Sequence, residues 1–286
     1  MRYRFIKKFQ GTFSIVAMCR VLQVSSSGYY AWTRRSESER SRENQNLLAQ
    51  IKTIHKESRC TYGPLRIYDE LKDRGAICGR HRVARLMRKH GIRVKRKRRY
   101  KVTTDSRHNL PVAENMLNRQ FDVRAPNQVW GADVTFIPTR QGWLYLAVVL
   151  DLFSRRVVGW SMSRRNDRML VTSALKMALD ARRPEHLLHH SDRGSTYASN
   201  DYQTVLKQAN ITCSMSRKGN CWDNAPVESF FATLKRELIH HRHYQNRDEA
   251  RRDIFEYIEV FYNRKRKHSS IGYLSPVQYE QHYQLA

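Results

Sequence analysis

The chain of 286 residues is strongly basic, with 53 Lys and Arg against 26 Asp and Glu and a formal net charge of +27. Its longest uncharged apolar run, residues 142–150, is far shorter than the ~20 residues that a membrane-spanning helix needs. The five scattered cysteines include no C-x-x-C pair, which argues against a structural zinc and against a disulfide framework.

The positive charge is concentrated in the first part of the chain. Residues 1–110 hold 28 Lys and Arg against 8 Asp and Glu, whereas residues 111–286 hold 25 against 18. Phosphates neutralised by such cations release their counterions, so this distribution favours nucleic acid as the partner. A membrane-surface helix is the alternative, but the basic part lacks a broad apolar stripe opposite its charges.

Two helical hairpins are predicted in the first hundred residues. Apolar residues at helical spacing in 13–24 are followed by the break "SSSG" and by a second, aromatic and basic helix, which is the pattern of a helix-turn-helix. A second pair follows in "GPLRIYDELKDRG" and "ICGRHRVARLMRKHG". Ordinary helical hairpins have the same pattern, and the basicity favours DNA binding. We therefore predict a helix-turn-helix in 1–55 and a second, similar region in 56–102.

A basic run, "RVKRKRRYK", ends this part with seven positive charges in nine residues. Such a run is either a solvated segment or an arm that contacts phosphates, and the charge of the whole region favours the arm. The polar stretch 103–125 is predicted to be a linker. The residues of the run predicted to bind DNA are Lys95, Arg96, Lys97, Arg98 and Arg99.

The remaining residues, 126–286, are predicted to form an α/β domain. Three β-rich stretches separated by short turns indicate an antiparallel meander, and the alternation of helices and strands that follows implies a mixed five-stranded sheet flanked by helices. The stretches predicted as strands are 128–139, 142–153, 155–163, 186–192 and 211–216, and those predicted as helices are 166–183, 199–210, 224–238 and 247–268.

Three carboxylates stand out in this domain. Asp133 lies inside the first strand and Asp192 closes the fourth, so both reach one edge of the sheet if these strands are neighbours. Glu228 shares a helix face with Lys235. Three oxygen ligands suit Mg²⁺ or Mn²⁺, and two such ions can activate a hydroxyl for attack on a phosphodiester. Taken singly, each acid has an ordinary explanation: a hydrogen-bonded strand residue, a turn cap and a surface acid.

Three features near the C-terminal end have more than one interpretation. Asn224 is predicted to cap the helix that follows it rather than to touch DNA. Trp222 is predicted to pack in the core or a loop rather than to stack on a base. The basic cluster 264–267 is predicted to meet phosphates, with a helix C-terminal cation cluster as the alternative.

The chain closely resembles the second-frame transposase product of the bacterial insertion-sequence family numbered three, within the retroviral-integrase-like DDE superfamily. Asp192 and Glu228 have 35 residues between them, the spacing of that family, and Lys235 follows seven residues later. The resemblance implies a ribonuclease-H-like fold, with Asp133, Asp192 and Glu228 as catalytic ligands of two Mg²⁺ or Mn²⁺ ions and Lys235 near the DNA terminus. The segments that carry it include "PNQVWGADVTFIPT", "HHSDRGSTYAS", "SMSRKGNCWDNAPVESFFATLKRE" and "YIEVFYNRKRKHSSIGYLSPVQY".

The resemblance also implies a function. The protein would bind the terminal inverted repeats of an element, cleave a strand and transfer it to another DNA, as at least a dimer on DNA, in the bacterial cytoplasm at the nucleoid and without a membrane partner. Relatives often act as a longer frameshift fusion, so the first-frame product is a further expected partner. The alternatives are a non-catalytic DNA-binding regulator of transposition and a ribonuclease-H-like nuclease that cuts RNA–DNA hybrids.

Overall fold

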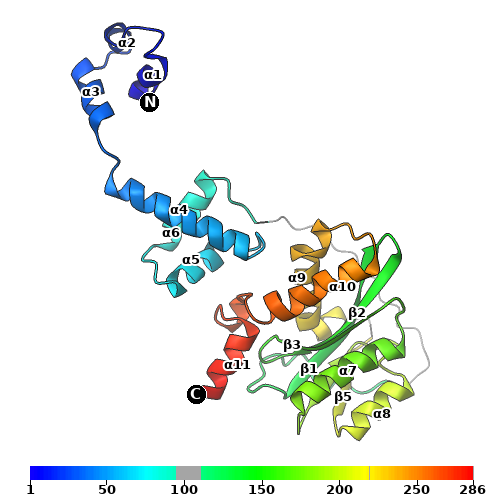
Figure 1. The fold of residues 1–286 in the computed structure, drawn as a ribbon. Helices are drawn as coiled ribbons and strands as arrows, with labels where there is room; N and C mark the ends of the chain where they lie inside the picture. The colour runs from blue at the N-terminus through cyan, green and yellow to red at the C-terminus, as the bar shows by residue number, and fades with distance from the viewer. Residues whose placement is uncertain (95–110, 219, 286) are drawn as a thin grey trace.

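The computed structural model describes residues 1–94, 111–218 and 220–285 (Figure 1). The predicted DNA-binding run, Lys95 to Arg99, lies outside the described residues. Within these ranges, no helix combines the length and the apolar character required to cross a bilayer.

The chain begins with three short helices that share a small core. Tyr29, in the third helix, is almost fully buried, and its hydroxyl donates to Gln10 Oε1 at 2.8 Å. The chain breaks between the second and third helices as predicted, but at 22–25 and not over the whole of "SSSG". The Ser25 hydroxyl accepts from the Gly28 N–H and caps the third helix, which begins at Ser26. The helices are α1 (Arg2–Phe9), α2 (Ile15–Val21) and α3 (Ser26–Arg34).

The next three helices form a second helical unit. Pro64 lies in the first turn of α5 (Pro64–Asp73), where a missing N–H costs nothing. The apolar face of α4 (Glu39–Glu57) packs on α5 and α6 (Arg80–Lys89). The boundary predicted after residue 55 therefore falls inside α4, a helix that packs with the second unit. The main residues of this core are Leu47, Ile51, Ile54, Ile67, Leu71, Val83, Leu86 and Met87.

A mixed five-stranded sheet organises the second half of the chain, as predicted. Its strand order is β3-β2-β1-β4-β5, so the first and fourth strands are neighbours. The first three strands are antiparallel, and β4 and β5 run parallel to β1. The strands are β1 (Val129–Thr139), β2 (Gly142–Asp151), β3 (Val157–Ser163), β4 (Leu188–Ser191) and β5 (Thr212–Met215).

Helices cover both faces of this sheet (Figure 1). Alternate residues of β2 face opposite ways: Ala147 and Val149 pack in the core with α7 and α8, whereas Val148 and Leu150 pack in the core with α9 and α10. The helices are α7 (Arg168–Arg182), α8 (Asn200–Gln208), α9 (Ala225–Glu237), α10 (Arg247–Phe255) and α11 (Pro276–Leu285).

The predicted helix 247–268 differs from the structure at its end. After α10 the chain widens into a π-helix, Glu256–Tyr262, and then leaves the helical path. Asn263 is buried there, and its side-chain amide both donates to the Val157 carbonyl and accepts from the Val157 N–H, at 3.0 Å each. This pairing ties the end of the helix to the start of β3, and it explains why the following residues turn away.

The end of this segment joins the second helical unit to the sheet domain. The Tyr62 hydroxyl donates to the Lys265 carbonyl at 3.1 Å and accepts from the Lys267 N–H at 2.8 Å. Lys267 Nζ forms ion pairs with Asp69, at 2.5 Å, and with Asp73 of α5. The prediction that the cluster 264–267 meets phosphates is therefore wrong for Lys267, because its charge is already paired and buried between the two units.

Candidate active site

The sheet register brings two of the three carboxylates together. Strand β4 pairs in parallel with β1 up to Ser191, which lies opposite Ala132. The next residue along each strand direction is an aspartate: Asp192 after Ser191, and Asp133 after Ala132. Both line a cavity of about 790 Å³, and Glu228 and Lys235 of α9 line the same cavity. The four residues singled out in the catalytic half thus share one space.

A glycine shapes the loop that carries Asp192. The Gly194 N–H donates to Asp192 Oδ1 at 2.8 Å. A Cβ atom on Gly194 would lie 2.9 Å from that same oxygen, closer than real Cβ contacts allow. Any larger residue here would displace the carboxylate or the turn, so glycine fixes the position of Asp192 at the end of the strand.

A second glycine sets the approach of α9 to β1. A Cβ atom on Gly131 would lie 2.7 Å from Val227 Cγ2, so only glycine allows the helix this close to the strand. Just before α9, the Asn224 side chain donates from Nδ2 to the Ala132 carbonyl at 3.0 Å and makes no cap hydrogen bond. The prediction that Asn224 caps the helix is therefore wrong. These contacts bring Glu228, in the first turn of α9, to the edge of the cavity.

A buried carboxylate anchors the turn that leads into α9. Asp223 accepts hydrogen bonds from Arg217, through both its backbone N–H and its guanidinium, and from Arg119 Nε at 2.9 Å. These bonds, with Arg217 as the main cause, hold the pKa of Asp223 well below its usual range. Sequence reasoning missed Asp223, because nothing local shows that Arg119, 104 positions earlier, joins the nearby Arg217 in binding it.

The acids of the cavity interact unfavourably with one another. Burial and the neighbouring Asp192 and Glu228 raise the pKa of Asp133 well above its ordinary value, although the Val134 N–H donates to it at 2.7 Å. Burial also raises the pKa of Glu228. Like charges held this close need a compensating cation to remain ionised together.

Lys235 supplies part of that compensation. Burial lowers the pKa of its ammonium group, and Asp133 acts in the opposite direction. Its Nζ lies 5.0 Å from the centroid of the Phe136 ring on β1, within range of a cation–π contact. One cation beside three acids leaves this cavity with an excess of negative charge inside a protein of net charge +27.

The three carboxylates line one cavity without forming a ready ligand set. Over residues 1–94, 111–218 and 220–285, no three His, Cys, Asp or Glu side chains converge closely enough to hold a metal ion as they stand. Mutual repulsion is a sufficient physical reason, because bare carboxylates separate until a cation screens them.

Further residues of this cavity were not anticipated. Tyr197 is almost fully buried beside the aspartates, and its hydroxyl has no hydrogen-bond partner among the described residues. Trp222 also lines the cavity but is 68% exposed, so of the two predicted environments, core and loop, the core is excluded. No sequence signal marks Tyr197, since it follows Asp192 on an ordinary polar loop.

Family models match three segments of the chain. An integrase core domain matches residues 123–221, an HTH-like domain matches residues 41–100, and a second integrase core model matches residues 228–283. Similar solved structures include the HTLV-2 integrase catalytic core domain in complex with magnesium (dimeric form). That domain is 19% identical, with a TM-score of 0.42, over 55% of this chain and 97% of that one.

Much nearer relatives come from insertion sequences. The "Insertion element IS600 uncharacterized 31 kDa protein" of Shigella sonnei is 48% identical over 94% of this chain and all of the relative. "Transposase InsF for insertion sequence IS3A" of Escherichia coli (strain K12) is 47% identical over 98% of both chains. The chain therefore belongs to the transposases of the IS3 family of insertion sequences.

Proposed function

We propose that this transposase cleaves and joins DNA through Asp133, Asp192 and Glu228, which together hold two Mg²⁺ or Mn²⁺ ions. The observation that carries the proposal is the shared cavity, to which β1, the end of β4 and α9 each contribute one carboxylate. A negative cavity on a strongly basic protein makes sense if the basic surface holds the DNA and the acids hold the cations that act on it.

The donor set fits the ions. Carboxylate oxygens are the ligands that hard divalent cations prefer. The raised pKa of Asp133 reflects burial first and then repulsion from Asp192, and bound cations would offset both. When bound, the ions would activate the attacking hydroxyl and stabilise the leaving oxygen of a phosphodiester. Asp133 lies within β1 and Asp192 directly follows the end of the neighbouring strand β4, whereas Glu228 comes from a separate helix.

The proposed reaction has two steps. In the first step, water attacks the phosphodiester at the element end, the bond to the 3′ oxygen breaks, and a 3′-hydroxyl is freed. In the second step this hydroxyl attacks a phosphodiester of another DNA in line, and the oxygen that it displaces leaves. The protein forms no covalent bond to DNA in either step, and the Lys235 ammonium holds a phosphate beside the reacting one.

The helical units would bind the DNA, and more than one copy of the chain would act together on it. The HTH-like segment and the three helices before it would bind the terminal repeats. Two element ends must be held together for joining, which requires at least two copies of the chain on DNA. The first-frame product of the same element is a further proposed partner.

Strand transfer tests this proposal directly. The full chain is incubated with labelled terminal-repeat DNA and Mg²⁺, alongside Asp192→Asn and the control Asp248→Asn, an exposed acid of α10. We expect joined product from the wild type and the control and none from Asp192→Asn, which should still bind the DNA.

Two other results would indicate a different function for the protein. Binding without strand transfer under any divalent metal, including with the fused form of the protein, would indicate a non-catalytic regulator. Cleavage confined to RNA–DNA hybrids would indicate a ribonuclease-H-like nuclease.

A further inference from the structure

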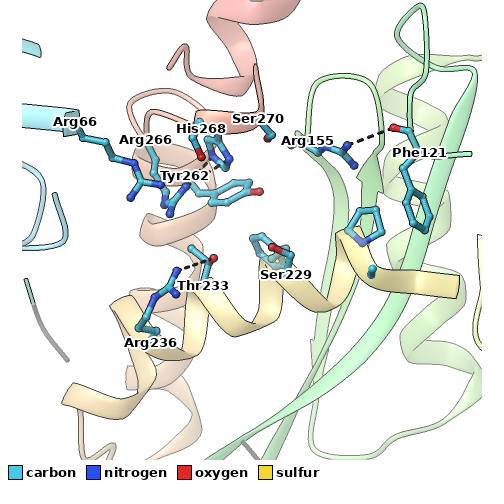
Figure 2. Close-up of a pocket in the computed structure, with 14 residues that line it drawn as sticks. Arg66, Phe121, Arg155, Ser229, Thr233, Arg236, Tyr262, Arg266, His268 and Ser270 are labelled. Atoms are coloured by element: carbon cyan, nitrogen blue, oxygen red, sulfur yellow. Dashed lines mark hydrogen bonds between the residues drawn. The ribbon is translucent and has the colours of Figure 1, made fainter. Parts of the chain in front are cut away.

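A second cavity, of about 440 Å³, lies against the other flank of α9 (Figure 2). None of the fourteen described residues that line it is an Asp or a Glu. Its cations come from four separate parts of the chain, and Figure 2 shows them around one space. They are Arg66 of α5, Arg155 between β2 and β3, Arg236 of α9 and Arg266 after the π-helix; we call this the arginine pocket.

Among the residues that the structure describes, only one of these arginines has an acidic partner. Arg266 is buried and donates to both carboxylate oxygens of Glu237, at 2.8 Å each. Within the described part of the chain, Arg66, Arg155 and Arg236 form no ion pair with any carboxylate. The pocket therefore holds three guanidinium groups that form no direct ion pair with a carboxylate of the described residues.

The hydrogen bonds of these arginines are also incomplete. Arg155 donates from Nη2 to the Phe121 carbonyl at 3.3 Å, but its Nη1 is buried and has no partner among the described residues. Arg236 donates to the Thr233 hydroxyl at 3.2 Å and to no acid. A buried guanidinium group without an acceptor is costly, so the pocket is suited to a ligand that brings several acceptor oxygens.

Burial and mutual repulsion act on the cations of the pocket. Burial lowers the pKa of Arg155, and burial together with Arg266 lowers that of Arg66. Burial and the same arginines lower the pKa of His268 well below its ordinary value, and its Nε2 lies 3.2 Å from Arg266 Nη1. An anion bound in the pocket would offset the repulsion between these arginines.

We propose that the arginine pocket binds phosphate groups of the DNA backbone, at a site separate from the carboxylates. Ala225 and Ser229 line both cavities, so the two sites lie on adjoining flanks of one helix. Arg66 belongs to the HTH-like segment, so a strand seated here would contact that segment and the sheet domain at once. The choice of DNA over a free phosphoanion rests on the proposed function.

The test measures the salt dependence of DNA binding without any divalent metal. The full-length double variant Arg66→Gln/Arg236→Gln is compared with the wild type and with Arg252→Gln, a matched change at an exposed arginine of α10 outside both cavities. On a duplex oligonucleotide in EDTA, the plot of log Kobs against log salt should be shallower by about 0.9 for each phosphate that the variant no longer neutralises. The affinity should fall on the order of tenfold at fixed salt, and each single variant should give a smaller change in the same direction.

A calorimetric titration with inorganic pyrophosphate separates the sources of the phosphate. Weaker pyrophosphate binding in the double variant with an unchanged DNA slope would keep the site but overturn its assignment to DNA. An unchanged slope together with unchanged pyrophosphate binding would overturn the proposal entirely. Because no metal is present, these outcomes do not depend on strand transfer. A failure of the carboxylate proposal would instead appear only in the joining assay.

Discussion

The two cavities beside α9 carry opposite charge although one helix lines both. Glu228 and Lys235 face the first cavity, and Thr233 and Arg236 face the second. In the first, three carboxylates outnumber one ammonium group, and in the second four guanidinium groups meet no acid of the lining. Glu237, the partner of Arg266, lies in the last turn of the same helix. The net charge of +27 therefore conceals a sharp local separation of charge.

Each cavity lacks the counter-charge that its own side chains require. Carboxylates gathered in one partly buried space require cations, and guanidinium groups without acidic partners require anions. A DNA strand with its metal ions would supply both at once. Substitutions on either flank of α9 should therefore have separable effects on strand transfer and on stability.

The largest effect is expected from Glu228→Gln. The amide is a weaker ligand than the carboxylate, and changes in groups that merely support a ligand already cost about 10–100-fold, so we expect strand transfer to fall by at least about a hundredfold. Joined product is measured at saturating DNA, with Glu256→Gln, an exposed acid of the π-helix, as the control. A variant as active as the wild type would remove Glu228 from the reaction.

The next effect concerns stability on the arginine flank. Arg266→Met should cost about 3–5 kcal/mol, because it leaves Glu237 buried without its cation. Denaturant unfolding followed by near-UV circular dichroism measures the loss. The double variant Glu237→Gln/Arg266→Met should recover part of it, and a double variant less stable than the single one would contradict the pairing.

A smaller effect is expected where α9 meets β1. Gly131→Ala should destabilise the sheet domain by about 1–3 kcal/mol, because its Cβ would lie 2.7 Å from Val227 Cγ2. It should also lower strand transfer, since it pushes Glu228 away from the aspartates. Adding Val227→Ala removes the clashing atom, so the two substitutions should be less harmful together than the sum of their separate effects. If the changes in melting temperature caused by Gly131→Ala and Val227→Ala were strictly additive, the contact between residues 131 and 227 would not be tight.

The smallest effect is a pH dependence from Asp223. Hydrogen bonds from Arg217 lower its pKa in the folded protein, so this carboxylate stabilises the fold above its unfolded pKa of about 3.9. That stability is lost as the pH falls through the lower, folded pKa. The melting temperature of Asp223→Asn should therefore lie below that of the wild type at pH 7, with the gap narrowing at pH 3. A gap independent of pH would mean that the charge of Asp223 contributes nothing.

Much of the catalytic half follows from the sequence because its signals are local. The β-rich stretches and the short turns between them predict the sheet, and they place Asp133 inside the first strand and Asp192 at the end of the fourth. The arginine pocket could not be predicted, since its cations are distant in sequence and each belongs to a different element. Asn224 shows the same limit: its type suits a helix cap, but its partner is the Ala132 carbonyl of a strand 92 positions earlier.

Manganese binding to the protein–DNA complex shows whether Asp133, Asp192 and Glu228 form a metal site. Electron paramagnetic resonance can count Mn²⁺ bound to the full chain on a terminal-repeat duplex whose 3′ end is deoxygenated, so that joining is blocked. We predict two bound ions per active site in the wild type, and weaker or absent binding in Asp133→Asn, Asp192→Asn and Glu228→Gln alike. Equal manganese binding by the wild type and all three variants would contradict the assignment of these carboxylates as the metal site.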